Sequence, residues 1–123
     1  MDIEKFDGLI KSYNENCTKI LTSKGREYQN NTGTKVDVLA NFKRGSGLTG
    51  IKPTTVLMVY MAKHWDSLST FIKDIESGKT IQEIEANLSE PIDGRIIDIH
   101  NYLYLLSAFV EEMRAENGGK TIQ

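Results

Sequence analysis

The spacing of apolar residues is the sequence feature that most constrains this fold. In three long segments, at about residues 2–23, 53–77 and 89–117, apolar residues recur at alternating intervals of three and four. Such spacing places them on one side of an α-helix, and an average interval of 3.5 residues is typical of helices packed at shallow angles. No segment alternates apolar and polar residues over six positions as a half-buried strand does. The sequence therefore predicts an all-α fold, an antiparallel bundle of three long helices.

Glycine, proline and serine mark the expected helix ends. Gly25 follows the first segment, where a glycine commonly stands just beyond a helix C-terminus. Pro53 fits the first turn of the second helix and Gly78 fits its end. Ser89 is the expected N-cap of the third helix, which ends before Gly118. One or two short helices are expected between the long ones.

The apolar sides of the three helices are expected to form the core. Their residues are Ile3, Phe6, Ile10, Tyr13, Cys17 and Ile20 in the first segment, Leu57, Met61, His64, Leu68, Phe71 and Ile75 in the second, and Ile92, Ile96, Ile99, Leu103, Leu106, Val110 and Met113 in the third. The short helices are expected at about residues 36–44 and 80–87, and residues 25–35 form a Gly- and Asn-rich connection.

The third segment carries a second stripe one residue behind its apolar side. This second stripe consists of Pro91, Arg95, Asp98, Tyr102, Leu105 and Phe109. A helix with two such sides usually buries the second one against another subunit. We therefore expect a homodimer or a higher symmetric oligomer. Coverage of the stripe by the short helices of a monomer is the alternative.

Length and composition place the chain among soluble globular domains. Its 123 residues suit one domain, expected over residues 1–117, with a flexible tail at 118–123. The longest apolar run, residues 56–62, is too short to cross a membrane, and the acidic N-terminus is unlike a secretion signal. Cys17 is the sole cysteine, which excludes an intrachain disulfide and a thiolate metal cluster. We expect a cytoplasmic protein with no membrane partner.

Charge is small overall but unevenly distributed. The chain carries a net charge of −2, while residues 24–52 hold six basic and two acidic residues. An isoelectric point near 5.7 argues against a nucleic acid polymer as the ligand, because duplex-binding domains are usually strongly basic. A basic segment on an acidic body suits a small anion better. An ordinary solvated loop is the alternative interpretation.

Polar side chains interrupt the facing sides of the second and third helices. They are Lys63, His64 and Ser67 in the second helix and Arg95, Asp98, Asn101 and Tyr102 in the third. Burying so many polar groups costs several kcal/mol unless they are paired or bind a ligand. Two interpretations follow: a structural network in which Lys63 or Arg95 neutralises Asp98, or a ligand pocket.

The basic segment adds groups suited to nucleotides. Lys24 and Arg26 flank a glycine and can contact phosphate oxygens, while Tyr28 and Phe42 offer rings for base stacking. The sequence at residues 45–47 lacks the lysine and the spacing of a phosphate-binding loop. No Ser-His-Asp arrangement for nucleophilic catalysis stands out.

Four stretches occur in an order associated with a known family: KGREY at 24–28, NFKR at 41–44, YMAKHWDS at 60–67 and EPIDGRIIDIHNYL at 90–103. Together they resemble the nucleotide-modification-associated domain of phage and prophage proteins, which is related to the MazG-like all-α NTP pyrophosphohydrolases. The resemblance covers about residues 5–113 and rests on the ordered set. It implies a MazG-like oligomeric bundle that handles nucleotides in a phage context.

The chain departs from the metal site of MazG-like hydrolases. Those enzymes hold Mg²⁺ with an acidic pair on one helix and a Glu-x-x-Asp pair on the next, because Mg²⁺ prefers several oxygen ligands. Here Arg95-x-x-Asp98 and Lys63-His64-x-x-Ser67 stand at those places, which leaves one carboxylate. We therefore expect no metal cofactor. Mg²⁺ is expected only if other carboxylates replace the missing ones, the candidates being Glu27, Asp66, Glu90 and Asp93.

The sequence thus predicts a phage-type nucleotide-binding protein that holds a phosphorylated nucleotide in a cationic pocket between helices without cleaving it. It would sequester a nucleotide or a host immune signalling nucleotide, as an anti-defence sponge. The expected binding residues are Lys24, Arg26, Tyr28, Asn41, Phe42, Lys63, His64, Ser67, Arg95, Asp98, Asn101 and Tyr102. The alternatives are a Mg²⁺-dependent nucleotide pyrophosphohydrolase and a protein-interaction module that inhibits a host factor.

Overall fold

The computed structural model describes residues 1–118, and of Lys24 and Tyr28 it describes the backbone alone. Its five helices are α1 (Ile3–Thr32), α2 (Ala40–Thr49), α3 (Pro53–Glu76), α4 (Ile81–Glu85) and α5 (Ile92–Glu116). Residues 1–118 contain no strand, and the predicted all-α class is confirmed. None of the helices in this range is long and apolar enough to span a bilayer. Most of the predicted tail, residues 119–123, lies outside the described residues.

The chain divides into two compact units, Met1–Val38 and Leu39–Gln123. The first unit is built on α1, and the second contains α2 to α5. The single domain predicted over residues 1–117 remains a prediction.

Helix α1 is longer than the sequence predicts. Asp2 caps its start, accepting a hydrogen bond from the Lys5 backbone N–H at 2.8 Å. The helix continues through Gly25 and ends at Gly33, which adopts a left-handed φ of 69°. The expected end near Ser23 is therefore wrong, because one glycine inside a helix costs only about 1 kcal/mol and the following residues extend the helix. The left-handed cap that stops it forms at the later glycine.

Helix α2 begins and ends later than the predicted 36–44. It runs through Gly45 and Gly47 and ends at Gly50, where φ is 75°. Gly45 permits a close approach to α3, since a Cβ atom there would lie 3.1 Å from Cγ1 of Val56. Gly45 therefore serves helix packing, and Gly45 and Gly47 lie within α2 and not in a loop.

Helix α3 matches its prediction, while α5 starts later than expected. Pro53 opens α3 and Gly78 follows its end with φ of 97°. Short helix α4 provides Glu85, whose Oε2 accepts a hydrogen bond from the Ile92 backbone N–H at 2.8 Å. The Glu85 carboxylate thus satisfies a backbone N–H in the first turn of α5 that has no partner within the helix. The residue directly before α5 is Pro91, so the prediction of Ser89 as the N-cap is wrong.

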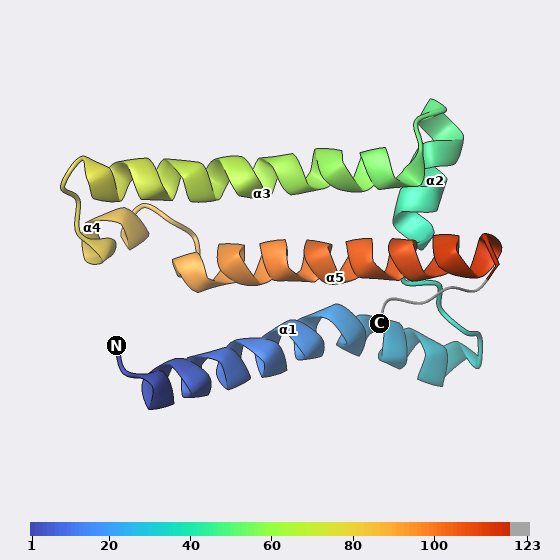
Figure 1. The fold of residues 1–123 in the computed structure, drawn as a ribbon, viewed down its shortest axis with the longest axis horizontal. Helices are drawn as coiled ribbons and strands as arrows, with labels where there is room; N and C mark the ends of the chain where they lie inside the picture. Colours follow the sequence, from blue (N-terminus) through green and yellow to red (C-terminus); the bar gives the residue numbers. More distant parts are fainter. Residues whose placement is uncertain (119–123) are drawn as a thin grey trace. The chain divides into compact units, whose positions relative to one another are not determined.

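In the second unit α3 and α5 run side by side and antiparallel, with α4 joining them at one end (Figure 1). Helix α2 packs against the start of α3 near the end of α5. The buried core at this junction consists of Leu39, Phe42, Leu57 and Phe109. Phe42 and Phe109 meet edge to face, with ring centroids 6.0 Å apart. Three helices therefore converge on one small core.

The face of α5 that packs on α3 is not the predicted one. Phe109 of the second stripe is 4% exposed, and Tyr102 of the same stripe packs against the core. Leu103, Leu106 and Met113 of the expected apolar side remain 46%, 37% and 41% exposed. The second stripe thus packs within the chain at Tyr102, Leu105 and Phe109, while the expected homodimer or higher oligomer remains a prediction. Its large rings fill the space that α2 and α3 leave open, which smaller aliphatic residues would not fill.

Candidate functional site

A polar cluster lies between α3 and α5. His64 Nδ1 is 3.4 Å from Oδ2 of Asp98, and the His64 ring lies 5.1 Å from the Tyr102 ring at a tilt of 40°. Nearer the start of α5, Nη1 of Arg95 donates a hydrogen bond to Oγ of Ser67. The predicted meeting of these α3 and α5 residues is therefore confirmed. On each helix they stand three or four residues apart, which places them on one side.

The pairing within this cluster differs from the structural network considered for the sequence. Asp98 pairs with His64, whereas Lys63 is exposed and Arg95 bonds to a hydroxyl. Within residues 1–118, Nε of Arg95 and Oδ1 of Asn101 are buried without a hydrogen-bond partner. Each unpaired buried polar group costs about 1–3 kcal/mol. A water or a ligand group that bonds to these two atoms would remove this cost.

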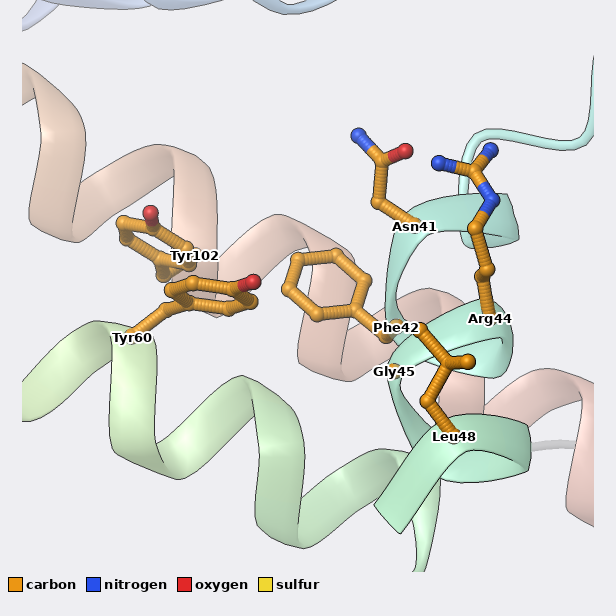
Figure 2. A pocket seen from close by; sticks show the side chains of 7 residues that line it. All are labelled: Asn41, Phe42, Arg44, Gly45, Leu48, Tyr60 and Tyr102. Atoms are coloured by element: carbon orange, nitrogen blue, oxygen red, sulfur yellow. The ribbon is translucent and has the colours of Figure 1, made fainter.

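A pocket of about 490 Å³ opens beside this cluster, where α2 meets α3 and α5 (Figure 2). Figure 2 shows Tyr60 on α3 and Tyr102 on α5, with the Phe42 ring pointing from α2 toward them. Asn41 and Arg44 extend from α2 on one side of the pocket. The full lining is Asn41, Phe42, Arg44, Gly45, Leu48, Tyr60 and Tyr102.

The lining is polar and cationic at its rim and aromatic at its base. None of the lining residues is acidic, and the exposed Arg44 guanidinium has no partner among the described residues. Burial raises the pKa of Tyr102, and the negative charge of Asp98 and the nearby Tyr60 raise it further. The Tyr102 hydroxyl therefore stays protonated at neutral pH and remains a hydrogen-bond donor. Such a site can accept a ring and bind an anion.

The predicted site residues divide into four groups. Asn41, Phe42 and Tyr102 line the pocket, and the cluster adjoining it is His64, Ser67, Arg95, Asp98 and Asn101. Lys63 is exposed on the side of α3 that also carries Tyr60 and Ser67. Arg26 belongs to α1 in the first unit, and the side chains of Lys24 and Tyr28 lie outside the described ones.

Four pocket residues were absent from the predicted set: Arg44, Gly45, Leu48 and Tyr60. Arg44 stands three residues after Asn41 on α2, so helical spacing alone places the two on one side. Tyr60 stands four residues before His64, and the same reasoning would have found it. Neighbouring Lys43 has another role, since its Nζ lies 3.0 Å from a carboxylate oxygen of Glu112.

The carboxylates considered for Mg²⁺ do not converge in this structure. Across the described residues, no group of three or more His, Cys, Asp and Glu side chains is arranged to hold a metal ion. Glu90 instead folds over the start of α5, where its carboxyl group would lie 2.8 Å from a Cβ atom at Gly94. This position suits an interaction with the positive end of the helix dipole.

Comparison with family models, curated proteins and solved structures gives no match for this chain. The resemblance to the phage nucleotide-modification domain therefore remains a prediction from the sequence.

Proposed function

We propose that the second unit binds a phosphorylated nucleotide in the pocket between α2, α3 and α5. One observation carries the proposal: a lining that combines three aromatic rings with an amide and a free guanidinium, and that contains no carboxylate. A volume of about 490 Å³ is in the range of small-molecule sites. A single small nucleotide fits this pocket better than a nucleic acid polymer.

The base would lie against Tyr60 and Tyr102. Tyr60 is half exposed, so its ring is available to a ligand, while its contact with Phe42 at 5.7 Å holds it in place. Tyr102 is held similarly by the His64 ring. Stacking of a base on an aromatic side chain contributes about 1–3 kcal/mol.

The phosphates would lie along a line of cations at the rim. Arg44 can bind a phosphate through two parallel N–H donors. Lys63 stands one turn beyond Tyr60 on the same side of α3 and is exposed, so its side chain can approach the same ligand. Both positive groups are free of carboxylate partners among the described residues, which leaves their charge available to an anion.

Binding without cleavage is the activity that these groups support best. Asp98, the carboxylate expected to anchor Mg²⁺ in a hydrolase, is engaged by His64. Sequestration of a nucleotide in the cytoplasm, by a phage-type protein with a MazG-like oligomeric fold, agrees with the resemblance seen in the sequence. A host immune signalling nucleotide is one such ligand.

A thermal-shift screen tests the proposal directly. The panel comprises nucleoside mono-, di- and triphosphates, cyclic nucleotides, free nucleosides and inorganic phosphate, each with EDTA and with Mg²⁺. A ligand at a hundred times its Kd stabilises the folded state by about 2.7 kcal/mol, which raises Tm by several degrees in a domain this small. We expect this shift with a phosphorylated nucleotide in EDTA and a smaller one with nucleoside or phosphate alone. The absence of any nucleotide shift would refute nucleotide binding and favour the protein-interaction alternative.

Two variants with the same loss of charge locate the site. Arg44→Gln removes a charge-assisted hydrogen bond worth about 1.5–3 kcal/mol, so the Kd should rise by roughly 10- to 100-fold. Lys73→Gln removes a positive charge from the last turn of α3, away from the pocket, and should leave the Kd unchanged. Equal effects of the two substitutions would show that binding depends on overall charge.

The fate of the ligand separates binding from hydrolysis. After incubation with Mg²⁺ and denaturation of the protein, mass spectrometry should recover the nucleotide intact. Release of pyrophosphate that is lost in Asp98→Asn would instead establish the pyrophosphohydrolase alternative.

A further inference from the structure

The side of α3 that faces away from the pocket carries an apolar stripe at the protein surface. Met58, Trp65 and Ile72 are 62%, 62% and 63% exposed. They stand seven residues apart, which places them along one line of the helix. We call these three residues the α3 stripe.

The composition around the α3 stripe is that of an interface core. Between Met58 and Ile72 its neighbours on the same side of the helix are small or apolar: Met61, Ala62, Leu68 and Ser69. Thr54 and Glu76 stand on the same side at the two ends of the helix. The charged Lys63 and Asp66 stand about 100° or more round the helix from the stripe, at 100° per residue. Interface cores are depleted in charge and enriched in tryptophan and methionine.

We propose that the α3 stripe joins two copies of this chain in an antiparallel pair of α3 helices centred on Trp65. Trp65 lies at the middle of the helix Pro53–Glu76, with Met58 and Ile72 equally far on either side. A two-fold axis through Trp65 therefore sets Met58 against the partner's Ile72, and Ile72 against the partner's Met58. This is the self-complementary arrangement that an isologous interface requires.

The charges at the helix ends agree with this orientation. Antiparallel pairing brings Glu76 to the N-terminal end of the partner's α3, opposite the partner's Thr54. The residue at the start of that helix is Lys52, and α3 has no acidic residue in its first turn. A carboxylate is favourable beside a lysine and the positive end of a helix dipole.

The exposed side of α5 fits a two-fold contact less well. Leu103, Leu106 and Met113 are exposed by 46%, 37% and 41%, less than any residue of the α3 stripe. The α3 stripe also contains the chain's one tryptophan, the residue type most enriched among binding hot spots. The larger exposed area and the tryptophan both favour α3.

Light scattering and tryptophan fluorescence test the proposal together. Because Trp65 is the sole tryptophan, its emission reports on the α3 stripe alone. We expect a particle of twice 13.9 kDa that dissociates on dilution, with Trp65 emission moving to longer wavelength and acrylamide quenching increasing as it does. A monomer at every concentration would overturn the proposal. If Trp65 of that monomer were also shielded from acrylamide, another part of the same chain would cover the stripe.

A matched pair of variants identifies the face. Ile72→Glu should raise the Kd of the dimer at least tenfold, because a two-fold interface carries the substitution twice; Met58→Glu should act in the same way. Val59→Glu is the control, since Val59 is 61% exposed on the same helix but about 120° from Trp65. Circular dichroism verifies that each variant folds. A dimer that survives Ile72→Glu, or that Leu103→Glu dissociates equally, would place the interface elsewhere.

Discussion

Truncation of Phe109 tests which face of α5 holds the second unit together. The side chain is 4% exposed and lies at the junction of three helices, edge to face with Phe42 at 6.0 Å. Replacement of a buried phenylalanine by alanine costs about 3–5 kcal/mol, because three anchored helices cannot collapse onto the cavity. The better helix propensity of alanine returns roughly 0.5 kcal/mol. We expect Phe109→Ala to lower the free energy of unfolding by about 3–4 kcal/mol, which corresponds to roughly 12–30 °C in Tm.

Urea denaturation followed by circular dichroism at fixed protein concentration measures this loss. Leu106→Ala is the informative comparison, because the sequence places Leu106 in the core whereas the structure leaves it 37% exposed. Its cost should stay near 1 kcal/mol. Val59→Ala, at an exposed position, should change stability by less than about 0.5 kcal/mol. If Leu106→Ala proves more destabilising than Phe109→Ala, then α5 packs on its other side and our assignment of its faces is wrong.

Three further predictions concern stability. Gly50→Ala should lower the unfolding free energy by about 1–2 kcal/mol, because φ is 75° at Gly50. Gly47→Ala, inside α2, should raise the unfolding free energy by roughly 0.5–1 kcal/mol. Thermal melts in which Gly50→Ala stabilises the protein or Gly47→Ala destabilises it would contradict an end of α2 at Gly50. Burial, a nearby carboxylate and a second tyrosine raise the pKa of Tyr102, so the folded state holds this proton more tightly than the unfolded state. The contribution of Tyr102 to the free energy of unfolding is therefore complete below about pH 10 and declines as pH rises through the folded-state pKa. Urea titrations from pH 8 to 11 should show that the unfolding free energy declines more steeply in the native protein than in Tyr102→Phe. Equal declines in the two proteins would remove Tyr102 as the cause. A double-mutant cycle on Lys43 and Glu112 should give a coupling of about 0.2–1 kcal/mol that weakens with salt, and a salt-independent value would rule out an ion pair.

The helix class and the polar cluster were predictable because both depend on local spacing. Pro53 and Gly78 bound α3 as expected, and the three- and four-residue intervals placed His64 opposite Asp98. Helix ends were less predictable where several glycines compete. Gly25 and Gly33 have the same local chemistry, and the residues between them decide which one terminates α1.

The packed face of α5 was not predictable from periodicity. Its two stripes obey the same spacing and differ by one position, so the sequence pattern supports both. The shape of the space beside α2 and α3 selects the stripe that contains Tyr102 and Phe109. The pocket has the same origin, because Arg44 and Tyr60 meet through the packing of α2 on α3.

That packing gives Gly45 two parts in the site, because it lines the pocket itself and lets α2 approach α3 closely. A methyl group at this position would stand 3.1 Å from Cγ1 of Val56, so the Val56 side chain would have to give way by a few tenths of an ångström. Substitution of Gly45 is thus expected to alter helix packing and the pocket wall together, without changing any charged or hydrogen-bonding side chain of the lining.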